Sequence, residues 1–91
     1  MTQVRVLISG RVQGVGYRWW TEDEAARRGL HGWVRNRIDG RVEAVFAGEP
    51  ALVEDMVRAC NRGPRAARVT GVETLAHDGV VEPGFRSLPT A

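Results

Sequence analysis

The sequence predicts an α+β fold, a ferredoxin-like α/β sandwich with the element order βαββαβ. Two helices are expected on one face of an antiparallel sheet of four to five strands. Two segments with helical periodicity each lie between strand-like segments, a strong hairpin signal joins the two middle strands, and no linker divides the chain. Of the 91 residues, 43% are hydrophobic, so residues 1–91 are expected to form a single domain around one core.

The first predicted strand covers residues 3–12, where apolar and polar side chains alternate so that one face can pack on helices. The apolar positions are Val4, Val6 and Ile8. A helix is predicted to begin between Arg18 and Thr21. Thr21 and Glu24 have the spacing of a capping box, in which a hydroxyl and a carboxylate satisfy free backbone N–H groups. Gly29 suits the left-handed residue that commonly follows a helix.

Two further strands are predicted at residues 32–38 and 41–47, joined by a hairpin. Asp39-Gly40 between them is typical of a two-residue turn, because both positions of such a turn need a positive φ. The sequence therefore predicts that these strands are antiparallel neighbours. Trp33 in the first of them is expected to lie in the core.

The second half of the chain is predicted to add one helix and one or two strands. A proline that suits the first helical position starts the helix, which covers residues 50–62 and ends at a Gly-Pro pair. Residues 66–75 are predicted to form the fourth strand, with a bulge indicated by Gly71. A short edge strand is expected around Phe85.

Composition narrows the class of protein. The net charge of +2 comes from 13 basic and 11 acidic residues, and every basic residue is arginine. This mild excess favours anionic ligands and falls short of the dense basic stripe of a nucleic-acid binder. A single cysteine, Cys60, excludes an intrachain disulfide. With no long apolar run and no signal-peptide pattern, the protein is expected in the cytoplasm, away from membranes.

The segment from Ser9 to Arg18 is the most informative part of the chain. Its three glycines, Gly10, Gly14 and Gly16, allow backbone conformations in which successive N–H groups turn toward one anion. The helix that follows adds free N–H groups and a positive dipole end, and Arg18 can add a planar guanidinium. The loop lacks the Gly-Lys-Ser/Thr ending of the nucleotide-binding P-loop. Its glycine spacing also differs from the Gly-x-Gly-x-x-Gly of dinucleotide-binding folds. The loop therefore predicts a phosphate site, and a nucleotide is not the first ligand expected there.

Two motifs in this sequence resemble those of the acylphosphatase family. The first, Gly-x-Val-Gln-Gly-Val-x-Phe/Tyr-Arg, matches residues 10–18, with Tyr17 where phenylalanine is commoner. The second, Gly-Trp-Val-x-Asn-x-x-Asp-Gly-x-Val-Glu, matches residues 32–43. With a weaker signature after the second helix, the resemblance covers about residues 3–75.

This resemblance implies an enzyme that hydrolyses small acyl phosphates to a carboxylate and inorganic phosphate. By the same resemblance, Arg18 holds the phosphoryl group and Asn36 positions the attacking water. The backbone amides of the loop complete the predicted phosphate site, which comprises Gln13, Gly14, Val15, Gly16, Tyr17 and Arg18. Metal-ligand spacing is absent near the loop, and both histidines lack an evident partner, so no metal or cofactor is expected. The enzyme is expected to act as a monomer, without nucleic acid.

The sequence is compatible with several alternatives. Ferredoxin-like sheets also serve as RNA-recognition and ligand-binding modules, although the third strand lacks the aromatic pattern of the RNA-binding type. A domain within a larger carbamoyl-phosphate-processing protein is a third possibility, and the short chain favours a free enzyme. Trp19 and Trp20 can either pack on the sheet or border the site. The arginines near the hairpin can either form a solvated face or attract anionic substrates; they are Arg35, Arg37 and Arg41.

Overall fold

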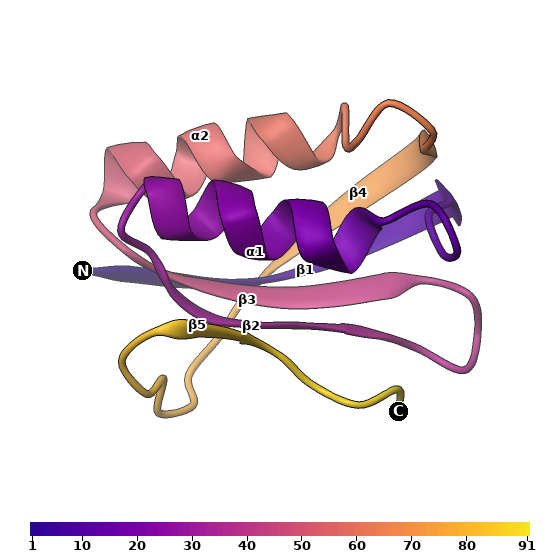
Figure 1. The fold of residues 1–91 in the computed structure, drawn as a ribbon. Helices are drawn as coiled ribbons and strands as arrows, with labels where there is room; N and C mark the ends of the chain where they lie inside the picture. The colour runs from indigo at the N-terminus through magenta and orange to yellow at the C-terminus, as the bar shows by residue number, and fades with distance from the viewer.

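The computed structural model describes residues 1–91. It consists of a five-stranded sheet with both helices on one face (Figure 1). The elements, in chain order, are β1 Thr2–Arg11, α1 Tyr17–Arg27, β2 His31–Asn36, β3 Val42–Gly48, α2 Pro50–Cys60, β4 Arg68–Ala76 and β5 Phe85–Ser87. The strand order in the sheet is β4-β1-β3-β2-β5. The predicted order βαββαβ and the additional edge strand are thus confirmed.

The edge strand β5 departs from the expected antiparallel sheet, because it pairs with β2 in parallel. β4 lies at the opposite edge, so residues 77–84 carry the chain across the sheet and return it alongside β2 (Figure 1). The Phe85 ring stacks on Phe46 of the core, with ring centroids 5.6 Å apart. Beyond β5, Leu88 N–H donates to the Val34 carbonyl and Ala91 N–H to the Asn36 carbonyl. The C-terminal segment therefore lies along β2 as far as Asn36.

The predicted hairpin between β2 and β3 is present, but its turn is longer than expected. Arg37 N–H donates to the Arg41 carbonyl at 2.8 Å, so residues 38–40 make the turn in place of Asp39-Gly40 alone. Gly40 has φ +93°, which is the position that a glycine fills in such three-residue turns. The Asp39 carboxylate accepts from Arg41 N–H and stabilises this longer form.

The core lies between the helices and the sheet face that they cover. Its fully buried members include Val6, Ile8, Val42, Phe46, Val53 and Met56. The expected inward face of the first strand is therefore confirmed, and so is the bulge in β4, where the register with β1 shifts opposite Gly71 and Val69. Neither helix is long and apolar enough to cross a membrane.

Trp33 lies outside this core, contrary to the prediction. Side chains alternate along a strand, and its neighbour Val34 is fully buried against the helices, so Trp33 points to the other face of the sheet. There the guanidinium of Arg35 lies 4.9 Å from the centre of the indole ring. The tryptophan thus stabilises the sheet face that carries no helix through a cation–π contact.

Candidate active site

The loop between β1 and α1 brings the chain into the helix without a side-chain cap. Gly14 and Gly16 have φ +73° and +81°, conformations that residues with a Cβ rarely adopt. α1 begins at Tyr17, directly after Gly16. The expected capping box is therefore wrong: Thr21 lies one turn inside the helix, is fully buried, and donates from Oγ1 to the Tyr17 carbonyl at 2.8 Å.

The backbone N–H groups of residues 13–19 donate to no acceptor within the protein. Those of the loop are free because the glycines turn the chain out of any ladder, and those of the first helical turn are free because no earlier carbonyl is in reach. Together with the positive end of the helix dipole, these donors form a site suited to an anion. The predicted phosphate cradle is consistent with this geometry.

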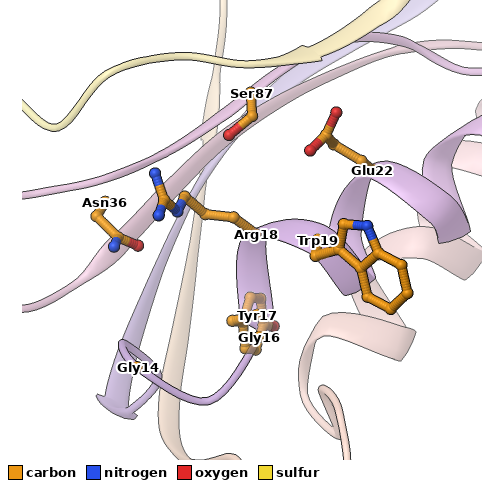
Figure 2. Close-up of a pocket in the computed structure, with 8 residues that line it drawn as sticks. All are labelled: Gly14, Gly16, Tyr17, Arg18, Trp19, Glu22, Asn36 and Ser87. Atoms are coloured by element: carbon orange, nitrogen blue, oxygen red, sulfur yellow. The ribbon is translucent and has the colours of Figure 1, made fainter.

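A pocket of about 340 Å³ opens above this loop (Figure 2). Its lining residues are Gly14, Gly16, Tyr17, Arg18, Trp19, Glu22, Asn36 and Ser87. The side chain of Arg18 extends from α1 toward Asn36, which lies at the end of β2 (Figure 2). The structure thus brings together the two residues for which catalytic roles are predicted, although they are far apart in the sequence.

Arg18 differs from every other partly buried arginine of the chain, because no carboxylate pairs with it. The others that are half-buried all form ion pairs; they are Arg5, Arg28, Arg35, Arg37 and Arg41. A half-buried guanidinium has lost part of its hydration, and an anion is the partner that restores its hydrogen bonds. The charge of Arg18 is therefore available to a ligand in the pocket.

The arginines near the hairpin are, in contrast, already paired. Arg35 and Arg37 donate to the buried carboxylate of Glu43, and Arg41 donates to Asp39. Burial opposes ionisation of Glu43, but hydrogen bonds from Arg5 and Arg35 outweigh it and hold the pKa of this carboxyl below its usual value. These arginines share two carboxylates with Arg5, so this face keeps an excess of positive charge, and both alternatives that the sequence leaves open, a solvated face and attraction of anionic substrates, stay open.

Two predicted loop residues, Gln13 and Val15, do not line the pocket. The Gln13 side chain crosses to the hairpin, where its Nε2 donates to the carbonyls of Arg37 and Arg41 at 2.8 and 2.9 Å. Val15 packs against the core. The side chains of these residues hold the loop in place, and only their backbone N–H groups remain as candidate ligands.

Tyr17 contributes to the pocket only through its first-turn position, because its ring is buried. Its hydroxyl donates to the Cys60 carbonyl at 2.6 Å, and burial raises the pKa of the phenol far above its usual value. Burial also raises the pKa of the Cys60 thiol to about 12, and this cysteine lies fully buried in the core. Trp20 packs edge-on against Tyr17, whereas Trp19 is 79% exposed at the border of the pocket.

Two residues that line the pocket, Glu22 and Ser87, were not predicted from the sequence. Glu22 follows Arg18 by four positions, so both lie on the same side of α1, and this spacing was the available signal. Ser87 had no comparable signal, because its place depends on the parallel pairing of β5 with β2.

The acylphosphatase family model matches residues 4–86. A protein of Nitrobacter hamburgensis named acylphosphatase is 52% identical over 92 residues, covering 94% of this chain and 93% of that protein. One of Rhizorhabdus wittichii with the same name is 50% identical over 86 residues, covering 94% and 87%. The crystal structure of acylphosphatase from Bacillus subtilis has a TM-score of 0.91 at 36% identity, covering 97% of this chain and 99% of that one.

Proposed function

The chain belongs to the acylphosphatase family of hydrolases, and on that premise we propose that residues 13–18 hold the phosphoryl group of an acyl phosphate while Asn36 positions the attacking water. The family implies an acyl phosphate as substrate and inorganic phosphate as product. One observation carries the assignment. The only half-buried arginine without a carboxylate partner, Arg18, extends toward Asn36 above a row of free backbone donors (Figure 2).

The phosphoryl group needs donors for its three outer oxygens, and both kinds of donor are present. The backbone N–H groups of the loop and of the first helical turn are free, and their direction is set by the fold before the substrate arrives. The guanidinium of Arg18 can bind two oxygens at once through its planar fork. These groups stabilise the charge that the phosphoryl oxygens carry during transfer.

The leaving group makes the reaction undemanding. The departing atom is a carboxylate oxygen, and carboxylic acids have pKa values of about 4, so the bond breaks without a proton donor. The P–O bond to the acyl oxygen breaks as the bond between phosphorus and water oxygen forms. The electron pair remains on the carboxylate.

Asn36 suits the placement of the nucleophile. Its side-chain amide forms no hydrogen bond within the protein, although the residue is only partly exposed in the pocket. A neutral amide can accept a hydrogen bond from water and donate one to a phosphoryl oxygen, which orients the water for in-line attack. The proton lost by the water passes to a phosphoryl oxygen, so the reaction needs no separate base.

Hydrolysis of benzoyl phosphate in the presence of EDTA, followed by absorbance, tests the proposal. Replacement of Arg18 by alanine should lower kcat/KM by about 10³-fold, since it removes a preorganised charge from the transition state. The Arg18→Lys variant keeps the charge without the planar fork and should bind inorganic phosphate less tightly. Replacement of Asn36 by alanine should lower kcat by about 10²-fold with little change in KM.

Arg68→Ala is a matched control, because Arg68 is exposed, has no carboxylate partner and does not line the pocket. It removes the same charge and should leave kcat/KM within about twofold of the wild type. A pure KM effect in the Asn36 variant would contradict the role of that residue. If the folded wild type binds phosphate but does not hydrolyse benzoyl phosphate, the loop is an anion-binding site only and the proposed function is wrong.

We also propose that the protein acts as a monomer with a single domain. It is also expected to act in the cytoplasm on a diffusible substrate. Sedimentation equilibrium at assay concentrations tests the monomeric state, and a dimer mass would contradict it.

A further inference from the structure

Glu22 is the only partly buried carboxylate of the chain that has no cationic partner. The others in buried or half-buried positions pair with arginines; they are Glu24, Glu43 and Asp55. Glu22 lies four positions after Arg18 on α1 and lines the same pocket, yet the two side chains form no ion pair. The pocket therefore contains one unpaired charge of each sign.

The two charges face different parts of the pocket. Figure 2 shows the Arg18 guanidinium reaching toward Asn36, whereas the Glu22 carboxylate and the Trp19 indole lie on the other side of the Arg18 side chain. A second hollow of about 300 Å³ continues past Trp19 and Glu22 along α1, bordered by Asp23. There is thus room beside the phosphate site, on the side away from Asn36.

In-line displacement decides which substrate group occupies this side. The attacking water and the leaving group lie on opposite sides of the phosphorus atom. With the water at Asn36, the acyl group points away from Asn36, toward Trp19 and Glu22. We propose that Trp19 and Glu22 form the subsite for the acyl group, an inference that rests on the function proposed above.

The chemistry of this subsite selects among acyl phosphates. The exposed indole of Trp19 offers a flat apolar surface to a planar acyl group. The free carboxylate of Glu22 accepts hydrogen bonds from O–H or N–H groups and repels a second anion. Asp23 adds to this repulsion at the border of the hollow. The preferred substrates are planar, uncharged acyl groups with a hydrogen-bond donor, and acyl groups with a further carboxylate or phosphate are disfavoured.

Three substrates of similar shape test the selection: benzoyl phosphate, 4-hydroxybenzoyl phosphate and 4-carboxybenzoyl phosphate. Wild-type kcat/KM should be highest for the hydroxyl compound and lowest for the carboxyl compound. The Glu22→Gln variant should raise kcat/KM for the carboxyl compound by about fivefold more than it raises that for benzoyl phosphate, since it removes a like charge beside the acyl group. Trp19→Ala should lower kcat/KM for benzoyl phosphate by about fivefold and leave that for acetyl phosphate unchanged.

Glu54→Gln is the matched control, because Glu54 is an exposed carboxylate on α2 that has no ion pair and lines none of these hollows. It changes the net charge by the same amount. Equal effects of the Glu22 and Glu54 variants on the carboxyl compound would overturn the proposal in favour of a net-charge effect. So would an equal loss of kcat for all three substrates in Glu22→Gln, since this would place Glu22 in the chemical step.

The outcomes also separate this inference from the proposed function. If the wild type hydrolyses all three substrates but the ratios between them do not change in the Glu22 and Trp19 variants, the acyl subsite alone is refuted. If the wild type hydrolyses none of them, the proposed function itself fails. Circular dichroism and thermal unfolding of each variant establish that the comparison is between folded proteins.

Discussion

The side-chain amide of Gln13 donates to the backbone carbonyl of Arg37 at 2.8 Å and so joins the phosphate loop to the hairpin that carries Asn36. A second bond from the same nitrogen, to the Arg41 carbonyl, holds both sides of the turn. The loop and the hairpin come from distant parts of the sequence. Their relative position is therefore set in part by one glutamine, and in the proposed function this position aligns the water with the phosphoryl group.

Replacement of Gln13 by leucine tests this connection. Leucine has a similar volume and no donors, and the two carbonyls keep their backbone partners, so unfolding free energy should fall by only about 1 kcal/mol. The value of kcat should fall by about tenfold or more, because Asn36 is less well positioned, while inhibition by inorganic phosphate changes little. Steady-state kinetics and urea unfolding provide both values, and an unchanged kcat would show that the hairpin needs no such support.

The left-handed glycine before α1 should be needed for phosphate binding through its backbone conformation. A Cβ at Gly16 would meet no atom within 4 Å, so strain at φ +81° is the only cost of Gly16→Ala, about 1 kcal/mol. Realignment of the N–H groups should weaken inhibition by inorganic phosphate by about tenfold. Gly29→Ala is the control, since Gly29 has φ +68° and equal space but lies at the far end of α1. Equal phosphate inhibition in the two variants would contradict the prediction.

The hydroxyl of Tyr17 should contribute to stability, because it satisfies a carbonyl that the backbone cannot. The Cys60 carbonyl lies in the last turn of α2, and the residue four positions later is Pro64, which has no N–H. Replacement of Tyr17 by phenylalanine leaves this buried acceptor without a partner and should lower the unfolding free energy by about 1–3 kcal/mol. Urea unfolding measures the change, and equal stability of the two proteins would mean that water replaces the hydroxyl.

Glu43 should make stability depend on acid pH. Its pKa in the folded protein is lowered from 4.5, so the folded state binds this proton less readily than the unfolded state. Its stabilising contribution is therefore complete above pH 4.5 and is lost as the pH falls through the folded value. Glu43→Gln should lower the unfolding free energy at neutral pH by about 1–3 kcal/mol, and the gap from the wild type should narrow in acid.

Chemical unfolding across this pH range provides the comparison. Glu54→Gln again serves as the control, since its exposed carboxylate has no partner and should change stability little at any of these pH values. A gap between wild type and Glu43→Gln that stayed constant into acid would show that the ion pairs with Arg5 and Arg35 contribute nothing.

Local signals predicted most of the fold. Alternating apolar and polar residues located β1. The proline at the start of α2 and the Gly-Pro pair after its end located that helix. In two places the predictions erred because one local signal competed with another. Thr21 has the sequence of a cap, but the glycine loop starts the helix earlier and Thr21 is buried. Asp39-Gly40 has the sequence of a two-residue turn, but the Asp39 carboxylate stabilises a longer one.

The sequence by itself determined which groups the candidate site contains: a glycine loop followed by an arginine, an asparagine at the end of a strand, and the order of elements that carries them. Only the tertiary structure decided which charges are free. Arg18 and Glu22 are unpaired while Arg35, Arg37 and Arg41 are paired, and strand pairing across the sheet brings Glu43 and Ser87 to their places. The physical reason is that ion pairing and burial depend on distances between segments that are remote in the sequence. A local sequence pattern does not determine those distances.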